Sequence, residues 1–301
     1  AMRNGMSYIC DGIVGGSRKA AADIVYEHPD FSEFYGILKE SGTISLTATD
    51  GYSVSQGHPV ARGDKAVGNL VTINRTTKSF TSGLKTYAML NANHYTMYVP
   101  TNDAMQIAYQ RGMPSLADYQ ALEDSLGSKA DTLQQIRILW RDFIKYHIHG
   151  DALFVDGAGP NDTLRVREYD TLKSSFYFQT DDEGNIKTTS GEYNSIVGPS
   201  YRVNVTHADN DGITLYDEVE MKKPSSMRTP VHVVAVDTLR NLLGREYWIS
   251  SQATSATYNA KLKHSSSIVV HGVDRPLFYD EEQFKYVPRH VVQDTSVKRR
   301  K

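Results

Sequence analysis

The sequence predicts an α+β fold, in which a β-sheet packs beside several α-helices. Apolar side chains recur at helical spacing between residues 104 and 147. Short alternating runs separated by Gly- and Asp-rich turns follow residue 150. A further alternating run, at residues 95–100, ends at a proline. These three observations lead us to expect both helices and strands.

The first forty residues are expected to hold a loose arm and then short helices. Residues 1–19 contain Gly, Ser and charged side chains without periodicity, which is typical of a leader or arm. Within residues 20–40 the helical pattern comes from Ile24, Phe31, Phe34, Ile37 and Leu38. We expect a break at His28-Pro29-Asp30, and Asp30 or Ser32 as the cap of the second helix.

Residues 43–90 form the least regular part of the pattern. They are rich in Thr, Ser and Gly, with short alternating runs such as Leu70-Val71-Thr72-Ile73. This composition predicts an irregular or β-rich insertion. Because binding residues lie disproportionately on loops, individual specificity is expected here.

Residues 95–105, Tyr-Thr-Met-Tyr-Val-Pro-Thr-Asn-Asp-Ala-Met, predict a strand that leads directly into a helix. Pro100 marks the strand end, because proline cannot donate a hydrogen bond to a sheet ladder. Thr101, Asn102 and Asp103 offer side-chain oxygens to the unpaired amides of a first helical turn.

Three helices are predicted after this point, at residues 105–111, 116–126 and 131–147. The third is expected to be a core helix, because one broad face is apolar. That face carries Leu133, Ile136, Leu139, Trp140, Phe143 and Ile144. Tyr146 and His147 close this helix.

Strands dominate the prediction beyond Gly150. They are expected at residues 163–169, 174–179, 186–189 and 201–207. The turn at residues 209–212, Asp-Asn-Asp-Gly, predicts a hairpin. A calcium loop of the helix-flanked type, which needs a longer ligand spacing and a terminal bidentate glutamate, is disfavoured there.

Two further elements complete the pattern. Residues 239–247 are apolar at helical spacing and predict a helix. Residues 267–274, Ser-Ile-Val-Val-His-Gly-Val-Asp, predict a continuous apolar strand.

Composition indicates a globular protein without a strong electrostatic preference for partners. The chain has 301 residues, of which 40% are hydrophobic and 23% charged, with a formal net charge of -2. No global field therefore draws it to nucleic acid or an anionic membrane. Cys10 is the only cysteine, and no apolar run reaches the ~18 residues of a membrane span. The opening Ala1-Met2 resembles a cloning remnant, which leaves room for a removed signal or lipid anchor.

Four segments together resemble fasciclin-like (FAS1) domains. Residues 95–105 are similar to the first family box, approximately T-x-F-x-P-T-N-x-A-F, and residues 267–274 to the second, V-I-H-x-I-D-x-V-L. Residues 31–42 resemble the opening helix of the family, and Tyr146-His147 its tyrosine-histidine motif. The matches occur in family order. The insertion and Arg245-Glu246-Tyr247 look most like fasciclin-like proteins of gut Bacteroidetes.

This resemblance implies one enlarged domain over residues 20–280, a β-sheet wedge or sandwich packed with helices. The insertion at 43–90 departs from the family, and residues 281–301 are expected to be a C-terminal tail. The family implies an exported, non-catalytic adhesion or binding module at the cell surface, outer membrane or periplasm. It implies a protein or glycan partner, no nucleic acid, no cofactor, and membrane attachment only through a lost lipid anchor.

The histidines of the matched motifs, His147 and His271, are the first candidate site residues. A functional interpretation makes them ligands or general bases. The favoured interpretation is structural: a buried imidazole bonded to a carboxylate or a backbone carbonyl. Asp103 and Asp274 are candidate carboxylate partners, because a buried carboxylate needs donors to offset its desolvation.

Other motifs are weaker. Arg62-Gly63-Asp64 is an integrin-type tripeptide in the insertion and a weak binding candidate, for which a solvated loop is the favoured interpretation. Serines 265–267 near His271 lack the G-x-S-x-G elbow of a serine nucleophile. No His/Cys cluster has zinc spacing and no phosphate-cradling glycine loop occurs, so no metal site is predicted.

Two other classes of function stay open. The chain could be a structural subunit of a surface assembly that docks through the insertion, which an exposed apolar or tyrosine-rich patch would favour. It could also be an enzyme whose site no motif reveals, which a deep pocket with converging ionisable groups would favour.

Overall fold

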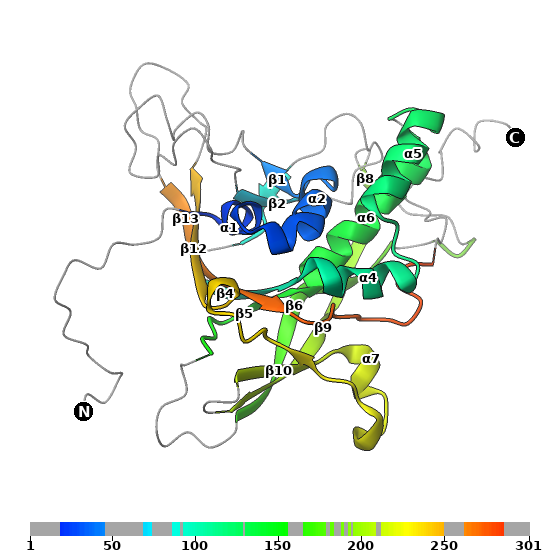
Figure 1. The fold of residues 1–301 in the computed structure, drawn as a ribbon. Helices are drawn as coiled ribbons and strands as arrows, with labels where there is room; N and C mark the ends of the chain where they lie inside the picture. The colour runs from blue at the N-terminus through cyan, green and yellow to red at the C-terminus, as the bar shows by residue number, and fades with distance from the viewer. Residues whose placement is uncertain are drawn as a thin grey trace, which may run out of the picture.

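An eight-stranded sheet that curls beside several helices dominates the computed structural model (Figure 1). This mixed arrangement agrees with the predicted α+β class. The structure describes residues 19–45, 69–73, 86–90, 93–128, 130–155, 165–178, 181–183, 188–189, 192–193, 195–208, 212–249 and 262–285.

The helices come mainly from the first half of the described chain. The α-helices are α1 Ala21–Glu27, α2 Ser32–Glu40, α4 Asn102–Gln110, α5 Leu116–Leu126, α6 Asp131–Tyr146 and α7 Glu218–Met221. Short 3-10 helices are η1 Pro29–Phe31, η2 Ser225–Met227 and η3 Asp237–Leu239. The strands are β1 Ile44–Ser45, β2 Asn69–Ile73, β3 Thr86–Ala88, β4 His94–Pro100, β5 Ile148–Gly150, β6 Arg165–Phe178, β7 Thr188–Thr189, β8 Glu192–Tyr193, β9 Ser195–Ala208, β10 Gly212–Tyr216, β11 Val231–His232, β12 Leu242–Ile249 and β13 Leu262–Val273.

The large sheet has the order β11-β10-β9-β6-β5-β4-β13-β12. Its neighbours are antiparallel except for β4 and β13, which run parallel, with Tyr98 opposite His271. The two strands that carry the family-like boxes therefore lie side by side, although they are distant in the sequence.

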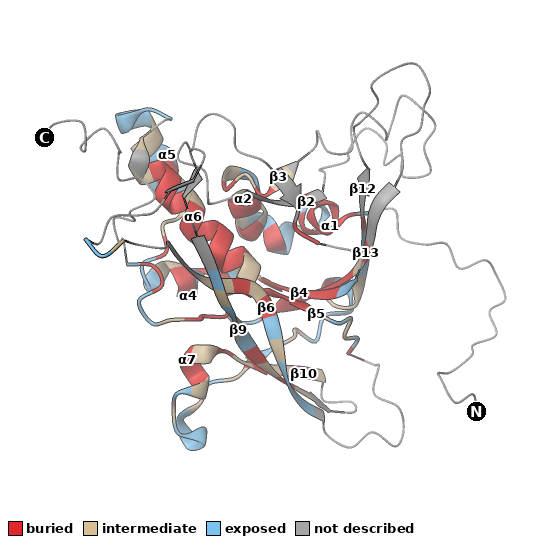
Figure 2. Cartoon of the chain, turned by 180° about the vertical axis from the view of Figure 1, so that it is seen from behind, coloured by how far each residue is buried: buried red, intermediate tan, exposed pale blue. Residues whose placement is uncertain are grey.

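Alternate residues of the central strands face two different cores. Met97 and Val99 of β4 join the larger core, in which the helices α1, α2, α4, α5 and α6 pack against the sheet. Tyr98, between them, faces a second core built around β9, β10 and β11. Figure 2 shows the buried residues concentrated along α6, α2 and the central strands.

The predicted helices at 105–111, 116–126 and 131–147 are confirmed as α4, α5 and α6. The break at His28-Pro29-Asp30 is also confirmed, because η1 separates α1 from α2. The predicted cap of the second helix is wrong: neither Asp30 nor Ser32 caps α2. The amide of Glu33 instead donates to Asn102 Oδ1 at 3.0 Å, across the start of α4.

The predicted helix at residues 239–247 is also wrong. After the short turn η3, this segment forms β12, which pairs antiparallel with β13 from Leu242 opposite Val270 onward. A Cβ at Gly244 would lie 2.9 Å from Ile268 Cγ2 of β13, so the glycine permits this close approach. Pairing with the buried β13 has outweighed the local helical spacing.

Part of the predicted insertion forms a small three-stranded sheet, β1-β2-β3. Ser45 pairs with Asn69, and Ile73 pairs with Thr86. The chain therefore leaves and re-enters this sheet at directly opposite positions. Leu70 is fully buried, and its amide lies 3.2 Å from Glu246 Oε2 of β12, so β2 is attached to the main sheet.

The hairpin predicted around residues 209–212 agrees with the antiparallel pairing of β9 and β10, in which Gly212 lies opposite Ala208. In the described part of the chain, no helix combines the length and the apolar character needed to cross a membrane.

Candidate functional site

The first family-like box lies at the junction of β4 and α4, as predicted. Thr101 is the N-cap of α4, and its Oγ1 accepts a hydrogen bond from the Ala104 amide at 3.3 Å. Asp103 is exposed in the first turn of α4, where its negative charge complements the helix dipole. The two residues stabilise the helix start.

Asn102 acts on a different helix. Its Oδ1 accepts from the Glu33 amide, and its Nδ2 donates to the carbonyl of Pro29 at 2.9 Å and to Ser32 Oγ at 3.0 Å. One side chain thus satisfies the N-terminus of α2 and the turn before it. The box therefore joins two segments about 70 residues apart.

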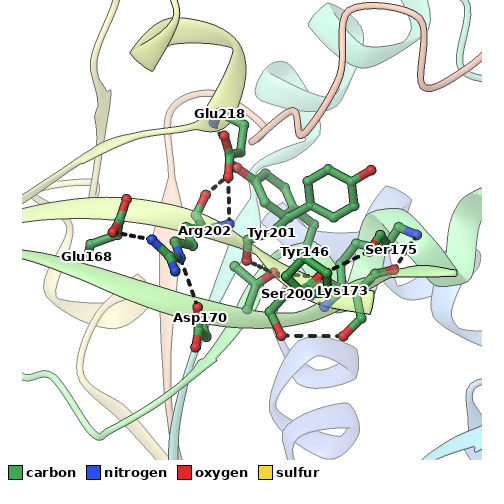
Figure 3. Close-up of polar contacts among 12 residues, drawn as sticks. Tyr146, Glu168, Asp170, Lys173, Ser175, Ser200, Tyr201, Arg202 and Glu218 are labelled. Atoms are coloured by element: carbon green, nitrogen blue, oxygen red, sulfur yellow. Dashed lines mark hydrogen bonds and ion pairs between the residues drawn. The ribbon is translucent and has the colours of Figure 1, made fainter. Parts of the chain in front are cut away.

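Tyr146 ends α6 and joins it to the other half of the sheet. Its hydroxyl donates to the Arg202 carbonyl of β9 at 2.7 Å and accepts from the Glu218 amide of α7 at 2.9 Å (Figure 3). Burial raises the pKa of this phenol, with a smaller contribution from the Asp217 charge. Tyr146 is therefore a neutral structural tie between α6, β9 and α7.

His147 is fully buried and bonded on both sides by backbone groups. Its Nδ1 lies 2.8 Å from the Phe143 carbonyl, and its Nε2 accepts from the Leu277 amide at 3.0 Å. These contacts assign the proton to Nδ1. Burial lowers the pKa of His147 to about 4, so the ring is neutral near pH 7.

His271 is likewise fully buried, on β13. Its Nδ1 accepts from the Asn241 amide at 3.2 Å, and its Nε2 lies 2.8 Å from the Leu153 carbonyl. Asp274, three residues on, is exposed, and its Oδ1 accepts from the His232 amide at 2.8 Å. The sequence left open a carboxylate or a backbone carbonyl as the partner of these histidines. The hydrogen bonds described here for His147 and His271 are all to backbone groups.

A row of rings crosses the sheet around His271. The rings of Tyr169, His149, Tyr98 and His271 come from the neighbouring strands β6, β5, β4 and β13, with successive centroids 4.4, 5.5 and 6.1 Å apart. Tyr98 Oη lies 3.0 Å from His149 Nε2. Burial lowers the pKa of His149 to about 4 and raises that of Tyr98. Sequence patterns did not single out Tyr98, His149 or Tyr169.

This row lacks the access that proton transfer to a ligand requires, because Tyr98, His149 and His271 are all fully buried. Both ring nitrogens of His147 and of His271 lie within hydrogen-bond distance of backbone groups. Within the described ranges, no group of three His, Cys, Asp or Glu side chains could hold a metal ion. The geometry of the motif residues therefore suits a scaffold.

A buried ion pair joins α6 to β6. Lys173 Nζ lies 3.2 Å from Asp142 Oδ2, with exposed side-chain fractions of 7% and 1%. The ammonium also donates to the Ser174 carbonyl and lies 5.5 and 5.1 Å from the ring centroids of Tyr201 and Tyr279. No sequence signal indicates this pair, because its members lie on different elements and match no motif.

The outer face of β6 and β9 carries a second, exposed charge cluster (Figure 3). Arg202 Nη1 lies 2.7 Å from Glu168 Oε2, and Arg202 Nε lies 3.2 Å from Asp170 Oδ1. Both carboxylates raise the pKa of Arg202, Glu168 more strongly. The three residues face solvent on directly paired strands.

Several sequence candidates fall elsewhere. Arg62-Gly63-Asp64 lies outside the described residues. Ser266 is buried, and Ser267 Oγ lies 2.5 Å from His94 Nδ1, where β4 begins.

No protein-family model matches the chain, and no curated protein matches it.

Proposed function

We propose that the chain is a fasciclin-like domain that acts as a non-catalytic binding module at the cell surface and recognises a protein or glycan partner. In this proposal it is exported to the surface, outer membrane or periplasm, and a lipid anchor is its only membrane attachment. The four family-like segments support the family, and their placement around one sheet supports a common scaffold.

One observation carries the proposal: four of the motif residues use their side chains to hold segments of the chain together. Asn102 ties α4 to α2, Tyr146 ties α6 to β9 and α7, and His147 and His271 bond backbone groups inside the protein. A fold whose signature positions are structural leaves recognition to surface positions.

A surface of suitable chemistry lies on the outer side of β9, β10 and β11. We call it the polar sheet face, and it consists of Asn204, Thr206, Thr214, Tyr216 and His232. Direct strand pairing places these side chains on one side: Thr214 lies opposite Thr206 and His232, and Tyr216 opposite Asn204. An aromatic ring among amide, hydroxyl and imidazole groups suits hydrogen bonding to a glycan or a protein backbone.

Docking of a structural subunit through the 43–90 insertion is the second candidate function. The β1-β2-β3 sheet favours it, because paired strands present both long connections of the insertion from one anchored platform. The third candidate function is that of an enzyme whose site no motif reveals, and no contact among the described residues favours it.

Binding assays on loop-replacement variants separate these candidates. Residues 46–68 are replaced by Asn-Gly, which closes a two-residue hairpin between the paired Ser45 and Asn69. Residues 74–85 are replaced in the same way between Ile73 and Thr86. Both variants keep Leu70 in the core, which a deletion of the whole insertion would remove.

Glycan arrays and pull-downs then compare the intact chain, both loop variants and a Tyr216→Ala/His232→Ala double variant. Gln120→Ala, an exposed change on α5, is the matched control. We expect the double variant to lose binding and the control to keep it. Loss only in the loop variants would move recognition to the insertion, and absence of any glycan or protein binding by the intact chain would refute the proposal.

A further inference from the structure

Two arginines lie one turn apart on α6. Arg141 is only 8% exposed, and its Nε donates to the Ser41 carbonyl at 2.6 Å. Arg137 is half-buried and places its guanidinium carbon 5.5 Å from the ring centroid of Tyr119 on α5. In the described part of the chain, neither arginine forms an ion pair with an acidic side chain.

Polar atoms beside these arginines are also unsatisfied. Arg137 Nε and the Tyr119 hydroxyl are both buried, and among the described residues neither makes a hydrogen bond of normal geometry. The Arg137 guanidinium lies close enough to the Tyr119 hydroxyl to favour its ionised form, so the two groups face the same point. A buried donor without a partner is rare in native proteins, because such a group normally bonds to the protein, to water or to a bound ion. Two such atoms beside two cations point to an anion.

The local electrostatics agree with this interpretation. Burial lowers the pKa of Arg141 to about 10, and the nearby positive charge of Arg137 adds to this effect. Glu123 and Glu40 lie near enough to raise the pKa of Tyr119, yet Glu40 forms its ion pair with Lys39, at 3.9 Å. The two guanidinium groups repel each other, and in the described part of the chain neither is paired directly with a carboxylate.

Neighbouring residues hold these groups in place. Tyr119 packs against Trp140, with ring centroids 5.1 Å apart, and Trp140 Nε1 donates to the Pro114 carbonyl at 3.0 Å. Gly42 has a φ of 71°, and a Cβ there would lie 3.5 Å from Arg141 Nη2. The glycine thus keeps a side chain away from the guanidinium.

We propose that Arg137, Arg141 and the Tyr119 hydroxyl bind one oxyanion group, a carboxylate, sulfate or phosphate. Guanidinium groups offer planar donor pairs that match the oxygens of such groups, and a phenol adds a further donor. The site lies on α5 and α6, so it is independent of the proposed polar sheet face.

Anion titrations of the full chain test this site. Sodium sulfate, phosphate, acetate and glucuronate are each compared with sodium chloride at equal ionic strength, because sulfate and phosphate also stabilise proteins non-specifically. Tryptophan fluorescence, to which Trp140 beside Tyr119 contributes together with Trp248, reports binding, and thermal unfolding reports stabilisation. We expect a saturable response to at least one oxyanion, and the ranking of the four identifies the preferred group.

Arg137→Gln should weaken this response about tenfold or more, because a charge-assisted hydrogen bond is lost. Arg202→Gln, which changes an exposed arginine, is the matched control and should leave the response intact. Tyr119→Phe keeps the ring and removes only the hydroxyl, so it tests the site if Arg137→Gln folds poorly. Equal responses in all three variants, or no saturable response in the unaltered chain, would overturn the proposal.

Discussion

Strand β6 contributes to two ion-pair sites that differ mainly in their exposure to water. Lys173 of β6 meets Asp142 inside the protein, where both side chains are at most 7% exposed. Arg202 of β9 meets Glu168 and Asp170 on the outer face, where the exposed fractions are 48% to 69%. The shortest distances are similar, 3.2 and 2.7 Å.

Distance alone therefore does not rank the contributions of these contacts to stability. In the interior, removal of one partner leaves a charge that water cannot reach, so the loss is large. On the outer face, water and salt screen the same attraction, and a lost partner is replaced by solvent. The variants below are ordered by the expected loss of unfolding free energy, from the buried ion pair to the exposed one.

Lys173→Met is expected to have the largest effect. It leaves Asp142 buried without its cation and should lower the free energy of unfolding by about 3–5 kcal/mol, measured by urea denaturation. The double variant Lys173→Met/Asp142→Leu removes both charges and should recover most of this loss. Equal losses in the single and double variants would show that packing, and not charge, dominates the interior site.

His271→Ala should come next, with a loss of about 2–4 kcal/mol. The change leaves the Asn241 amide and the Leu153 carbonyl without their partner and opens a cavity under β13. His94→Ala, at an exposed histidine on the adjacent strand, is the control and should alter the melting temperature little. Unchanged melting of His271→Ala, with selective loss of ligand binding, would contradict the structural role of His271.

Acidification should lower the free energy of unfolding, because two buried histidines are neutral in the folded protein. His147 and His149 have folded pKa values of about 4, below their usual value of 6.5, so the unfolded chain binds more protons between these limits. Their contribution to stability is complete above pH 6.5 and is lost as pH falls towards 4. Burial raises the pKa of Asp217 from 3.8 to about 6, so this residue contributes the opposite slope between those values.

Together, His147, His149 and Asp217 make the unfolded chain bind about one proton more than the folded chain between pH 6 and 4. The free energy of unfolding should therefore decrease by about 1.4 kcal/mol per pH unit between pH 6 and 4, measured by urea denaturation at each pH. Asp217→Asn removes the opposing contribution and should steepen the decrease. A flat profile in the unaltered chain would mean that the histidines accept protons without unfolding.

Asn102→Ala tests a partly exposed contact. It removes the cap of α2 and should cost about 1–2 kcal/mol of unfolding free energy. Asn102→Asp keeps an oxygen for the Glu33 amide but loses the donors to Pro29 and Ser32, so its loss should be smaller. Equal losses would locate the effect in the Nδ2 contacts.

Arg202→Ala should have the smallest effect on stability. Its partners face water, so denaturation curves should coincide with those of the unaltered chain within error at physiological salt. A clear destabilisation that disappears at high salt would show that Glu168, Asp170 and Arg202 form a cooperative network, and the difference between the two ion pairs would narrow.

The sequence predicted the elements whose signals are local. Pro100 ended β4, Thr101 capped α4, and the apolar face of α6 identified a core helix. It failed where distant segments decide the outcome: residues 239–247 form β12 because β13 lies beside them, and α2 is capped by Asn102 from another part of the chain. The surroundings of Lys173, Arg137 and His149 could likewise not be predicted, because each depends on neighbours that only the folded chain provides.

The parallel pairing of β4 with β13 also has a consequence for how the protein folds. His94 of β4 contacts Ser267 of β13 across 173 residues of sequence, and β13 pairs with β4 along its whole length. Closing so long a loop delays the contact, which makes folding slow by comparison with helical bundles. During synthesis, β4 must wait until almost the whole described chain has been made. Until then one edge of β4 lacks its paired strand, and the growing chain is exposed to aggregation.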